Sequence, residues 1–260
     1  MQRGLHPGHR ARGERQRSQL TRVKLSIHPD AGAANAVAAD LLAAWLTTPG
    51  VRNVMLAAGN TPLELYRLIG ERKLPLAHLN VFALDEYVGV PSDEPRNCAN
   101  LIRRAAAEPW GVPVNRYFTV SSLEVEALAS VQQHEQRIAE AGGLDVIVLG
   151  LGQNGHLGFN EPGSAEESVG RVLDLDAISI EANRKWFGGD YAPARGVTVG
   201  MKTILSARRV LLLACGALKT EAVHAMLNGP RTPDCPASLL QKHSGAHVVL
   251  DEAAAARLKK

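Results

Sequence analysis

The side chains that could perform acid–base chemistry lie in two short segments. Leu84-Asp85-Glu86-Tyr87 places two consecutive carboxyl groups directly after an apolar run. Burying such acids is costly unless they are solvated or paired, so Asp85 is a candidate general base, with a helix cap or salt-bridge partner as the other interpretation. The glycine-rich segment Gly150–Gly163 carries His156 and Glu161, five residues apart. Histidine titrates near neutral pH and a nearby carboxylate can orient it, which favours an acid–base pair over a structural histidine.

Three other positions are suited to binding a phosphate group. The turn Gly59-Asn60-Thr61-Pro62 opens an expected helix and offers backbone N–H groups, a positive helix end and a hydroxyl. Lys219 lies in the first turn of another expected helix, where a cation opposes the helix dipole unless an anion is bound. Arg184 lies in a polar stretch. Each position alone also fits a helix cap or a solvated charge, but together they predict a phosphate site of Gly59, Asn60, Thr61, Arg184 and Lys219.

Alternating strand and helix patterns separate these segments. We expect strands at 23–28 (an edge strand), 51–57, 80–84, 145–149 (a central strand), 210–215 and 247–250. We expect helices at 30–48, 61–69, 97–107, 123–141, 219–227 and 251–260. This alternation predicts a single α/β domain whose mostly parallel, doubly wound (Rossmann-like) sheet has helices on both faces. Because ligands bind outside the carboxyl ends of such strands, the turns after residues 57, 84, 149 and 215 should form one site.

Two other kinds of site are weighed against this interpretation. The pattern Gly150-Leu151-Gly152-Gln153-Asn154-Gly155 is a literal Gly-x-Gly-x-x-Gly after a strand, as in dinucleotide-binding turns. That turn should open a long helix, but Pro162 and Gly163 would end any helix at once, so we discount it. His156, Asp85 and Glu161 could ligate a cation, but no second close histidine supports them, and we predict no metal site. The three cysteines show no Cys-x-x-Cys spacing and no sign of a nucleophile.

The net charge of +3 is unevenly distributed. Residues 1–24 carry seven basic groups and one acid, so the other 236 residues hold 22 basic and 25 acidic groups. We expect a basic N-terminal tail at 1–22 and one domain at 23–260. The tail lacks an amphipathic period or an apolar run, which argues against a targeting role, and 4% aromatic residues are too few for a base-stacking surface. No apolar run reaches the ~18–20 residues that span a membrane. We therefore expect a cytoplasmic protein for which nucleic acid is an unlikely partner.

At these motifs the sequence resembles the glucosamine-6-phosphate deaminase family, whose fold is shared with 6-phosphogluconolactonase. The resemblance extends from about Val23 to Asp251 and is most specific at Leu84–Gly89 and in Gly155-His156 followed by Phe159-Asn160-Glu161-Pro162. It implies an isomerising deamination of an amino-sugar 6-phosphate without a cofactor. It also implies that Asp85 shuttles a proton, that His156 opens the sugar ring with support from Glu161, and that Thr61, Arg184 and Lys219 bind phosphate.

The sequence departs from the family pattern in two places. Asn154 stands where the deaminases typically carry an aspartate two residues before the histidine, and an amide can orient an imidazole but cannot stabilise imidazolium by charge. This feature resembles a galactosamine-6-phosphate branch, so either epimer could be the substrate. The stretch Ser164–Leu175 contains Arg171 but Leu173 replaces an expected lysine, so we expect no activation by N-acetylglucosamine 6-phosphate. We accordingly expect a monomer or small homo-oligomer rather than an allosteric hexamer.

Two alternative functions remain at this point. A 6-phosphogluconolactonase-like hydrolase would use the histidine and the phosphate site but need little from Asp85. A non-catalytic sugar-phosphate-binding protein would be consistent with Asn154 and would bind without turnover.

Overall fold

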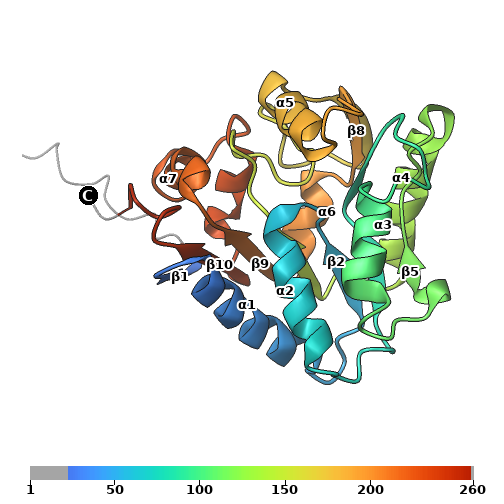
Figure 1. Cartoon of the computed structure of the whole chain (residues 1–260), viewed down its shortest axis with the longest axis horizontal. Coiled ribbons are helices and arrows are strands. Elements are labelled where there is room, and N and C mark those ends of the chain that lie inside the picture. Colours follow the sequence, from blue (N-terminus) through green and yellow to red (C-terminus); the bar gives the residue numbers. More distant parts are fainter. Residues whose placement is uncertain (1–22, 259–260) are drawn as a thin grey trace, which may run out of the picture.

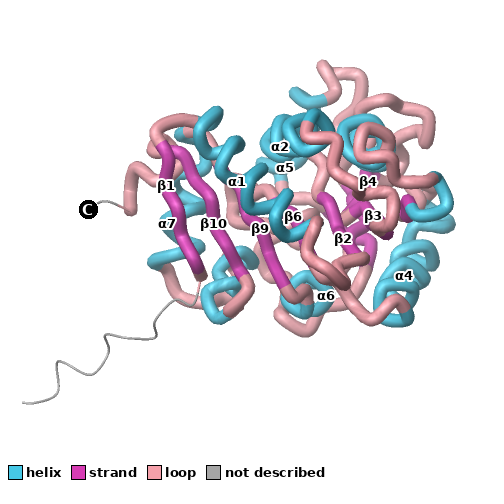
Figure 2. Tube along the Cα trace, turned by 90° about the horizontal axis from the view of Figure 1, so that it is seen from below, coloured by secondary structure: helices cyan, strands magenta, loops and turns pink. Residues whose placement is uncertain are grey.

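A seven-stranded, fully parallel sheet forms the centre of the molecule, in the order β1-β10-β9-β6-β2-β3-β5. The computed structural model describes residues 23–258, and the expected basic tail at 1–22 lies outside them. Figure 2 shows β1, β10, β9, β6 and β2 following one another across the molecule. As predicted, the first strand lies at an edge and the strand near 145–149 lies in the centre. The strands are β1 (Lys24–His28), β2 (Asn53–Leu56), β3 (Asn80–Ala83), β5 (Tyr117–Phe118), β6 (Val146–Leu149), β9 (Arg209–Ala214) and β10 (Ala246–Asp251).

Helices cover both faces of this sheet, which confirms the doubly wound α/β fold. Successive strand side chains point to opposite faces. Val54 of β2 belongs to an apolar cluster with α1 and α2, whereas Met55 belongs to a second cluster with α4, α6 and α7. Figure 1 shows α1 and α2 side by side in front of the strands. The α-helices are α1 (Ala31–Leu46), α2 (Asn60–Glu71), α3 (Cys98–Ile102), α4 (Glu124–Glu140), α5 (Ala177–Trp186), α6 (Met201–Ser206) and α7 (Thr220–Asn228).

A second, three-stranded antiparallel sheet was not expected from the sequence. It contains β4 (Asp85–Tyr87), β8 (Arg195–Thr198) and β7 (Arg171–Asp174), in the order β4-β8-β7. The chain leaves the parallel sheet at β3 and enters this small sheet at Asp85, which pairs with Thr198. Asp85 is therefore the first residue of a strand rather than part of an open turn, and pairing with β8 fixes its backbone.

Two other details of the chain differ from the expected elements. The helix expected at 97–107 begins as α3 and continues as the π-helical segment Arg103–Ala107. The helix expected at 251–260 is wrong, because residues 252–258 form successive turns after β10. The Asp251 carboxylate accepts N–H groups from Gly216, just after β9, and from Ala254, so it joins these turns to the end of β9. No helix within residues 23–258 is long and apolar enough to cross a membrane.

Candidate active site

One cavity of about 430 Å³ lies at the carboxyl ends of β2, β3, β6 and β9. All four turns that the sequence indicated contribute to its wall, together with one face of α5. Asp85 and His156 open into this same cavity, as do the Gly59–Thr61 turn and Lys219. The four segments that the sequence singled out therefore meet at one edge of the sheet.

The part of the cavity for which the sequence predicts a phosphate site is formed by two turns that each lead into a helix. Gly59 precedes α2, and no side chain within residues 23–258 caps the first N–H groups of that helix. Asn60 and Thr61 line the cavity at this helix start. The positive end of a helix with uncapped N–H groups attracts an anion.

Lys219 contributes a positively charged ammonium group to this part of the cavity wall. Its side chain is partly buried and forms no ion pair with any residue between 23 and 258. Burial lowers the pKa of Lys219, because desolvation disfavours the ammonium form. The Asp251 carboxylate holds the preceding turn through two hydrogen bonds of 3.0 and 2.9 Å from the Gly216 N–H. A half-buried ammonium without a carboxylate partner is a strong site for a bound anion.

Arg184 departs from the prediction. Its side chain is more than half exposed and lies 3.6 Å from the carboxylate of Glu181, and Arg184 does not line the cavity. The polar stretch forms helix α5, in which consecutive residues are turned by about 100°. Asn183 faces the cavity, so Arg184 lies on a different face of the helix.

Asp85 is a buried carboxyl group in the wall of the same cavity. The residue is 6% exposed. Burial raises the pKa of Asp85 to about 7, the negative charge of Glu86 adds to this effect, and a hydrogen bond from the Cys98 thiol opposes it. A carboxyl group with such a pKa exchanges protons near neutral pH, as a general base must.

The loop that carries the histidine approaches Asp85 very closely. A Cβ atom on Gly158 would lie 3.2 Å from Asp85 Oδ2 and 2.9 Å from Thr198 Oγ1. A Cβ on Gly152 would lie 2.4 Å from the His156 ring. Glycine at these two positions therefore leaves room for the acid and the imidazole in one cavity. The residues between 150 and 163 form turns and no helix, which agrees with setting aside the dinucleotide interpretation.

His156 is held by a chain of polar contacts. Its Nδ1 lies 3.3 Å from Glu161 Oε2 and 3.4 Å from the Ser179 hydroxyl. Asn154 donates to the same Glu161 oxygen at 2.7 Å and accepts the His156 backbone N–H at 3.3 Å. The amide therefore orients Glu161 and the loop backbone rather than the imidazole ring itself. Burial of Glu161 opposes its ionisation, but hydrogen bonds and charge from His156, with Ser179 and Asn154, hold the pKa of Glu161 below its usual range.

Glu86 has a different role from its neighbour Asp85. Its buried carboxylate accepts N–H groups from Tyr87 at 2.8 Å, Cys98 at 3.0 Å and Ala99 at 2.9 Å. It thus caps the start of α3 and fixes Cys98 beside Asp85. Of the two interpretations of the paired acids, Glu86 takes the helix-cap role and Asp85 faces the cavity.

Comparisons with known proteins place the chain in a family. Residues 30–249 match the family described as glucosamine-6-phosphate isomerases/6-phosphogluconolactonase. The chain belongs to this family. It is 38% identical to a glucosamine-6-phosphate deaminase of Rhodopirellula baltica, over 92% of this chain and 97% of that one. It is 35% identical to a glucosamine-6-phosphate deaminase of Streptomyces coelicolor, over 91% of this chain and 93% of that one.

Solved structures of the family share the fold. The structure of a monomeric glucosamine-6-phosphate deaminase superposes with a TM-score of 0.86 at 31% identity, covering 90% of this chain and 99% of the other. The 6-phosphogluconolactonase of Trypanosoma brucei superposes with a TM-score of 0.74 at 22% identity, covering 91% and 98% of the two chains. The second likeness shows the common fold alone.

The sequence did not indicate several residues that line the cavity in this family member. They come from α3 and α5, and they are Cys98, Ser179, Ala182 and Asn183. For α5 a signal existed, because Ser179, Ala182 and Asn183 are small or polar residues three and four positions apart on one helix face. Without the helix assignment, this spacing could not be recognised.

Proposed function

We propose that this chain catalyses the isomerising deamination of an amino-sugar 6-phosphate, with glucosamine 6-phosphate and galactosamine 6-phosphate as the two candidate substrates. The observation that carries the proposal is the shared cavity, which brings Asp85 and His156 together with Lys219 and the start of α2. The deaminase names of relatives at 35–38% identity support the same reaction. The products would be a ketose 6-phosphate and ammonia.

In this proposal the phosphate is bound away from the reacting carbons. Lys219 and the backbone N–H groups at Gly59–Thr61 take the phosphate, because these groups have positive charge or uncapped donors in the free protein. Binding energy from the phosphate then positions C1 and C2 of the sugar against the acid–base residues.

The first chemical step opens the sugar ring. His156 moves a proton between the anomeric hydroxyl and the ring oxygen, and Glu161 beside Nδ1 keeps the imidazole oriented. The carboxylate of Glu161 also stabilises the imidazolium form, a task that the amide of Asn154 cannot perform by charge.

The second step shifts a proton and releases the amine. Asp85 takes the C2 proton of the open-chain amino sugar and delivers it to C1, through an enediol-type species. The C2–N bond is then a ketimine, and one water molecule adds to C2 as ammonia leaves. The near-neutral pKa of Asp85 suits both the removal and the return of the proton.

The test compares ammonia release from glucosamine 6-phosphate and galactosamine 6-phosphate by the purified protein. Release from at least one epimer, with formation of the ketose 6-phosphate, supports the proposal, and the ratio of the two kcat/KM values identifies the preferred epimer. Acid release from 6-phosphogluconolactone without ammonia release would instead establish a lactonase. Tight binding of both amino sugars without turnover would establish a binding protein, and an NADH titration tests the dinucleotide interpretation.

The proposal also covers the allosteric activation, the oligomeric state and the cellular compartment of the protein. The guanidinium of Arg171 already donates to Asn160 Oδ1 at 2.9 Å and Ser164 Oγ at 2.7 Å, so it is engaged inside the fold and we expect no activation by N-acetylglucosamine 6-phosphate. We expect a monomer or small homo-oligomer, and the solved deaminase with the similar fold is monomeric. The three cysteines are free thiols, which suits a reducing compartment such as the cytoplasm.

A further inference from the structure

Asn183 is a buried polar side chain that the mechanism above does not use. It lines the cavity and is 7% exposed. Its Nδ2 atom is fully buried and has no hydrogen-bond partner within residues 23–258. Buried amide donors are normally paired, because an unpaired one loses its hydration without compensation. The free protein therefore holds an unpaired donor in a residue of the cavity wall, and a half-turn of the amide about χ2, which exchanges the positions of its nitrogen and oxygen, brings this donor to the cavity side.

Asn183 lies on the same helix face as a residue that contacts His156. It lies one helical turn after Ser179 on the same face of α5. The Ser179 hydroxyl lies 3.4 Å from His156 Nδ1, so this helix face runs from the imidazole along the cavity wall. The other α5 residues of the wall, Ile178 and Ala182, offer no polar side-chain group.

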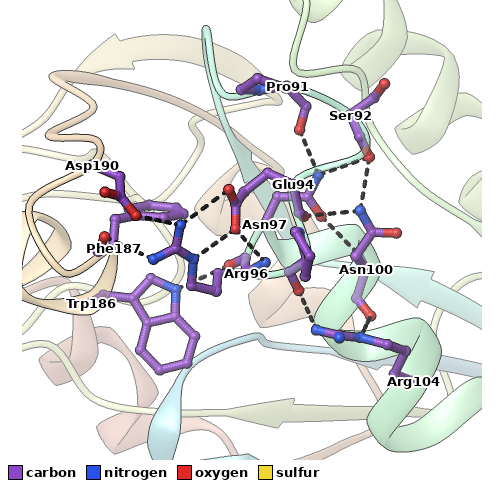
Figure 3. A network of polar contacts seen from close by, with 11 residues as sticks. Pro91, Ser92, Glu94, Arg96, Asn97, Asn100, Arg104, Trp186, Phe187 and Asp190 are labelled. Atoms are coloured by element: carbon purple, nitrogen blue, oxygen red, sulfur yellow. Dashed lines mark hydrogen bonds and ion pairs between the residues drawn. The ribbon is translucent and has the colours of Figure 1, made fainter.

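Both ends of α5 are fastened, so the helix holds the Asn183 side chain at the cavity wall. At the start of the helix, Asp176 accepts the Ile178 N–H at 2.9 Å. At its end, Arg96 donates to the Phe187 carbonyl at 2.8 Å and the Trp186 indole donates to the Arg96 carbonyl at 3.0 Å (Figure 3). Arg96 is in turn held between the carboxylates of Glu94 and Asp190 (Figure 3). Fixed donors of this kind lose little freedom when a ligand binds.

We infer that Asn183 is a substrate-binding residue whose side-chain amide donates a hydrogen bond to a hydroxyl group of the bound sugar. This inference rests on the proposed function. A neutral amide matches a neutral hydroxyl oxygen, whereas the phosphate is matched by the cation of Lys219. The hydroxyl takes the place of the missing acceptor, so the bond forms only in the complex.

The test uses Asn183→Leu, which keeps the branching and the number of side-chain heavy atoms and removes the amide, and Asn183→Asp, which keeps the shape and replaces the N–H donor. We expect both variants to raise KM for the amino-sugar phosphate by about 10-fold, the effect of one lost neutral hydrogen bond, with little change in kcat. Inhibition by inorganic phosphate should be unchanged. Because Asn183→Leu removes an unpaired buried donor, its Tm should equal or exceed that of the wild type.

The matched control is Asn35→Leu. Asn35 is a similarly buried asparagine in α1; its Nδ2 donates to the Ala31 carbonyl at 2.8 Å, its Oδ1 has no partner within residues 23–258, and it does not line the cavity. Its replacement should leave KM unchanged. An unchanged KM in both Asn183 variants, with wild-type ammonia release intact, would overturn the inference and leave the proposed function standing.

A second measurement separates the two proposals if the wild type releases no ammonia. Calorimetric titration with glucitol 6-phosphate, an open-chain sugar phosphate that cannot isomerise, reports binding without turnover. A Kd that rises about 10-fold in Asn183→Leu supports the inference even though the deamination is then refuted. An equal Kd in both proteins, or absence of binding to the wild type, overturns it.

Discussion

The two ends of the cavity are built on opposite principles. At the phosphate end, Lys219 has no ion-pair partner among residues 23–258 and α2 begins without a side-chain cap. At the acid–base end, His156, Glu161 and Asn154 are already bonded to one another. The first end keeps its groups unpaired in the free protein, so its interactions are completed by the ligand. At the second end these three residues hold one another in place before the ligand arrives, while Glu161 Oε1 and Asn183 Nδ2 have no hydrogen-bond partner within residues 23–258.

This difference separates binding from chemistry. Unpaired groups at the phosphate end destabilise the free fold and gain their partners on binding. Paired groups at the acid–base end add little to affinity but set the proton affinity of the reacting side chains. Substitutions at the two ends should accordingly change different kinetic constants.

The largest effect is expected at the acid–base end, from Asp85→Asn. The amide has almost the same shape but cannot accept the C2 proton, so kcat for ammonia release should fall by about 10³-fold, within the usual contribution of a general base. Binding of glucitol 6-phosphate, measured by calorimetry, should be nearly unchanged. Substantial ammonia release by this variant would remove Asp85 from the mechanism.

The next largest effect is expected at the phosphate end, from Lys219→Met. Loss of a charge-assisted hydrogen bond to phosphate should raise KM by about 10- to 100-fold with a much smaller change in kcat. Inorganic phosphate should raise the Tm of the wild type by binding the folded state, and this shift should disappear in the variant. The matched control is Lys202→Met, whose exposed ammonium lies 3.4 Å from Glu167 outside the cavity. A phosphate-dependent Tm shift retained in Lys219→Met would contradict the role of this lysine.

The two ends also differ in how far the sequence could predict them. The parallel strands are short but almost continuously apolar, so the turns after them, with Asp85, His156 and Lys219, could be placed at one sheet edge. The small sheet could not be predicted, because β4 is three residues long and pairs with β8 more than a hundred residues away. Helix α5 was not predicted either. Without it, the sequence could not show that Asn183 faces the cavity and that Arg184 lies on another face of the helix.

A smaller effect is expected from Glu161→Gln. The neutral amide can still accept a hydrogen bond from His156, but the charge that stabilises the imidazolium is lost, so kcat should fall by about 10-fold, part of the full acid–base contribution. KM should change little, because Glu161 contacts His156 and Asn154 and does not itself line the cavity. Stopped-flow or steady-state ammonia assays can measure this split. Glu108→Gln, at an exposed ion pair with Arg103, serves as the control. A rise in KM without loss of kcat would place Glu161 in binding instead.

The smallest effects concern the pH dependence that Asp85 imposes. Because the base must be ionised, kcat/KM should rise with pH through about 7, the pKa to which burial raises Asp85. The folded-state pKa lies above the ordinary value of 3.8, so the folded protein holds a proton that the unfolded chain has lost. This contribution to stability should therefore be present below about pH 4 and be lost as pH rises to about 7, and Asp85→Asn should lack it.

Two substitutions of Cys98 should move this pH dependence in opposite directions. The thiol hydrogen bond lowers the pKa of Asp85, against the stronger effects of burial and of Glu86. Cys98→Ala removes that bond, so the acid limb of the kcat/KM profile should move to higher pH. Cys98→Ser supplies a stronger donor, so the limb should move to lower pH. Shifts of the same sign in both variants would show that packing, rather than the hydrogen bond, links Cys98 to Asp85. An acid limb that moves in neither variant would indicate that the titrating base is another group. Of the acid–base residues, only His156 would then be held by its contacts before the substrate binds.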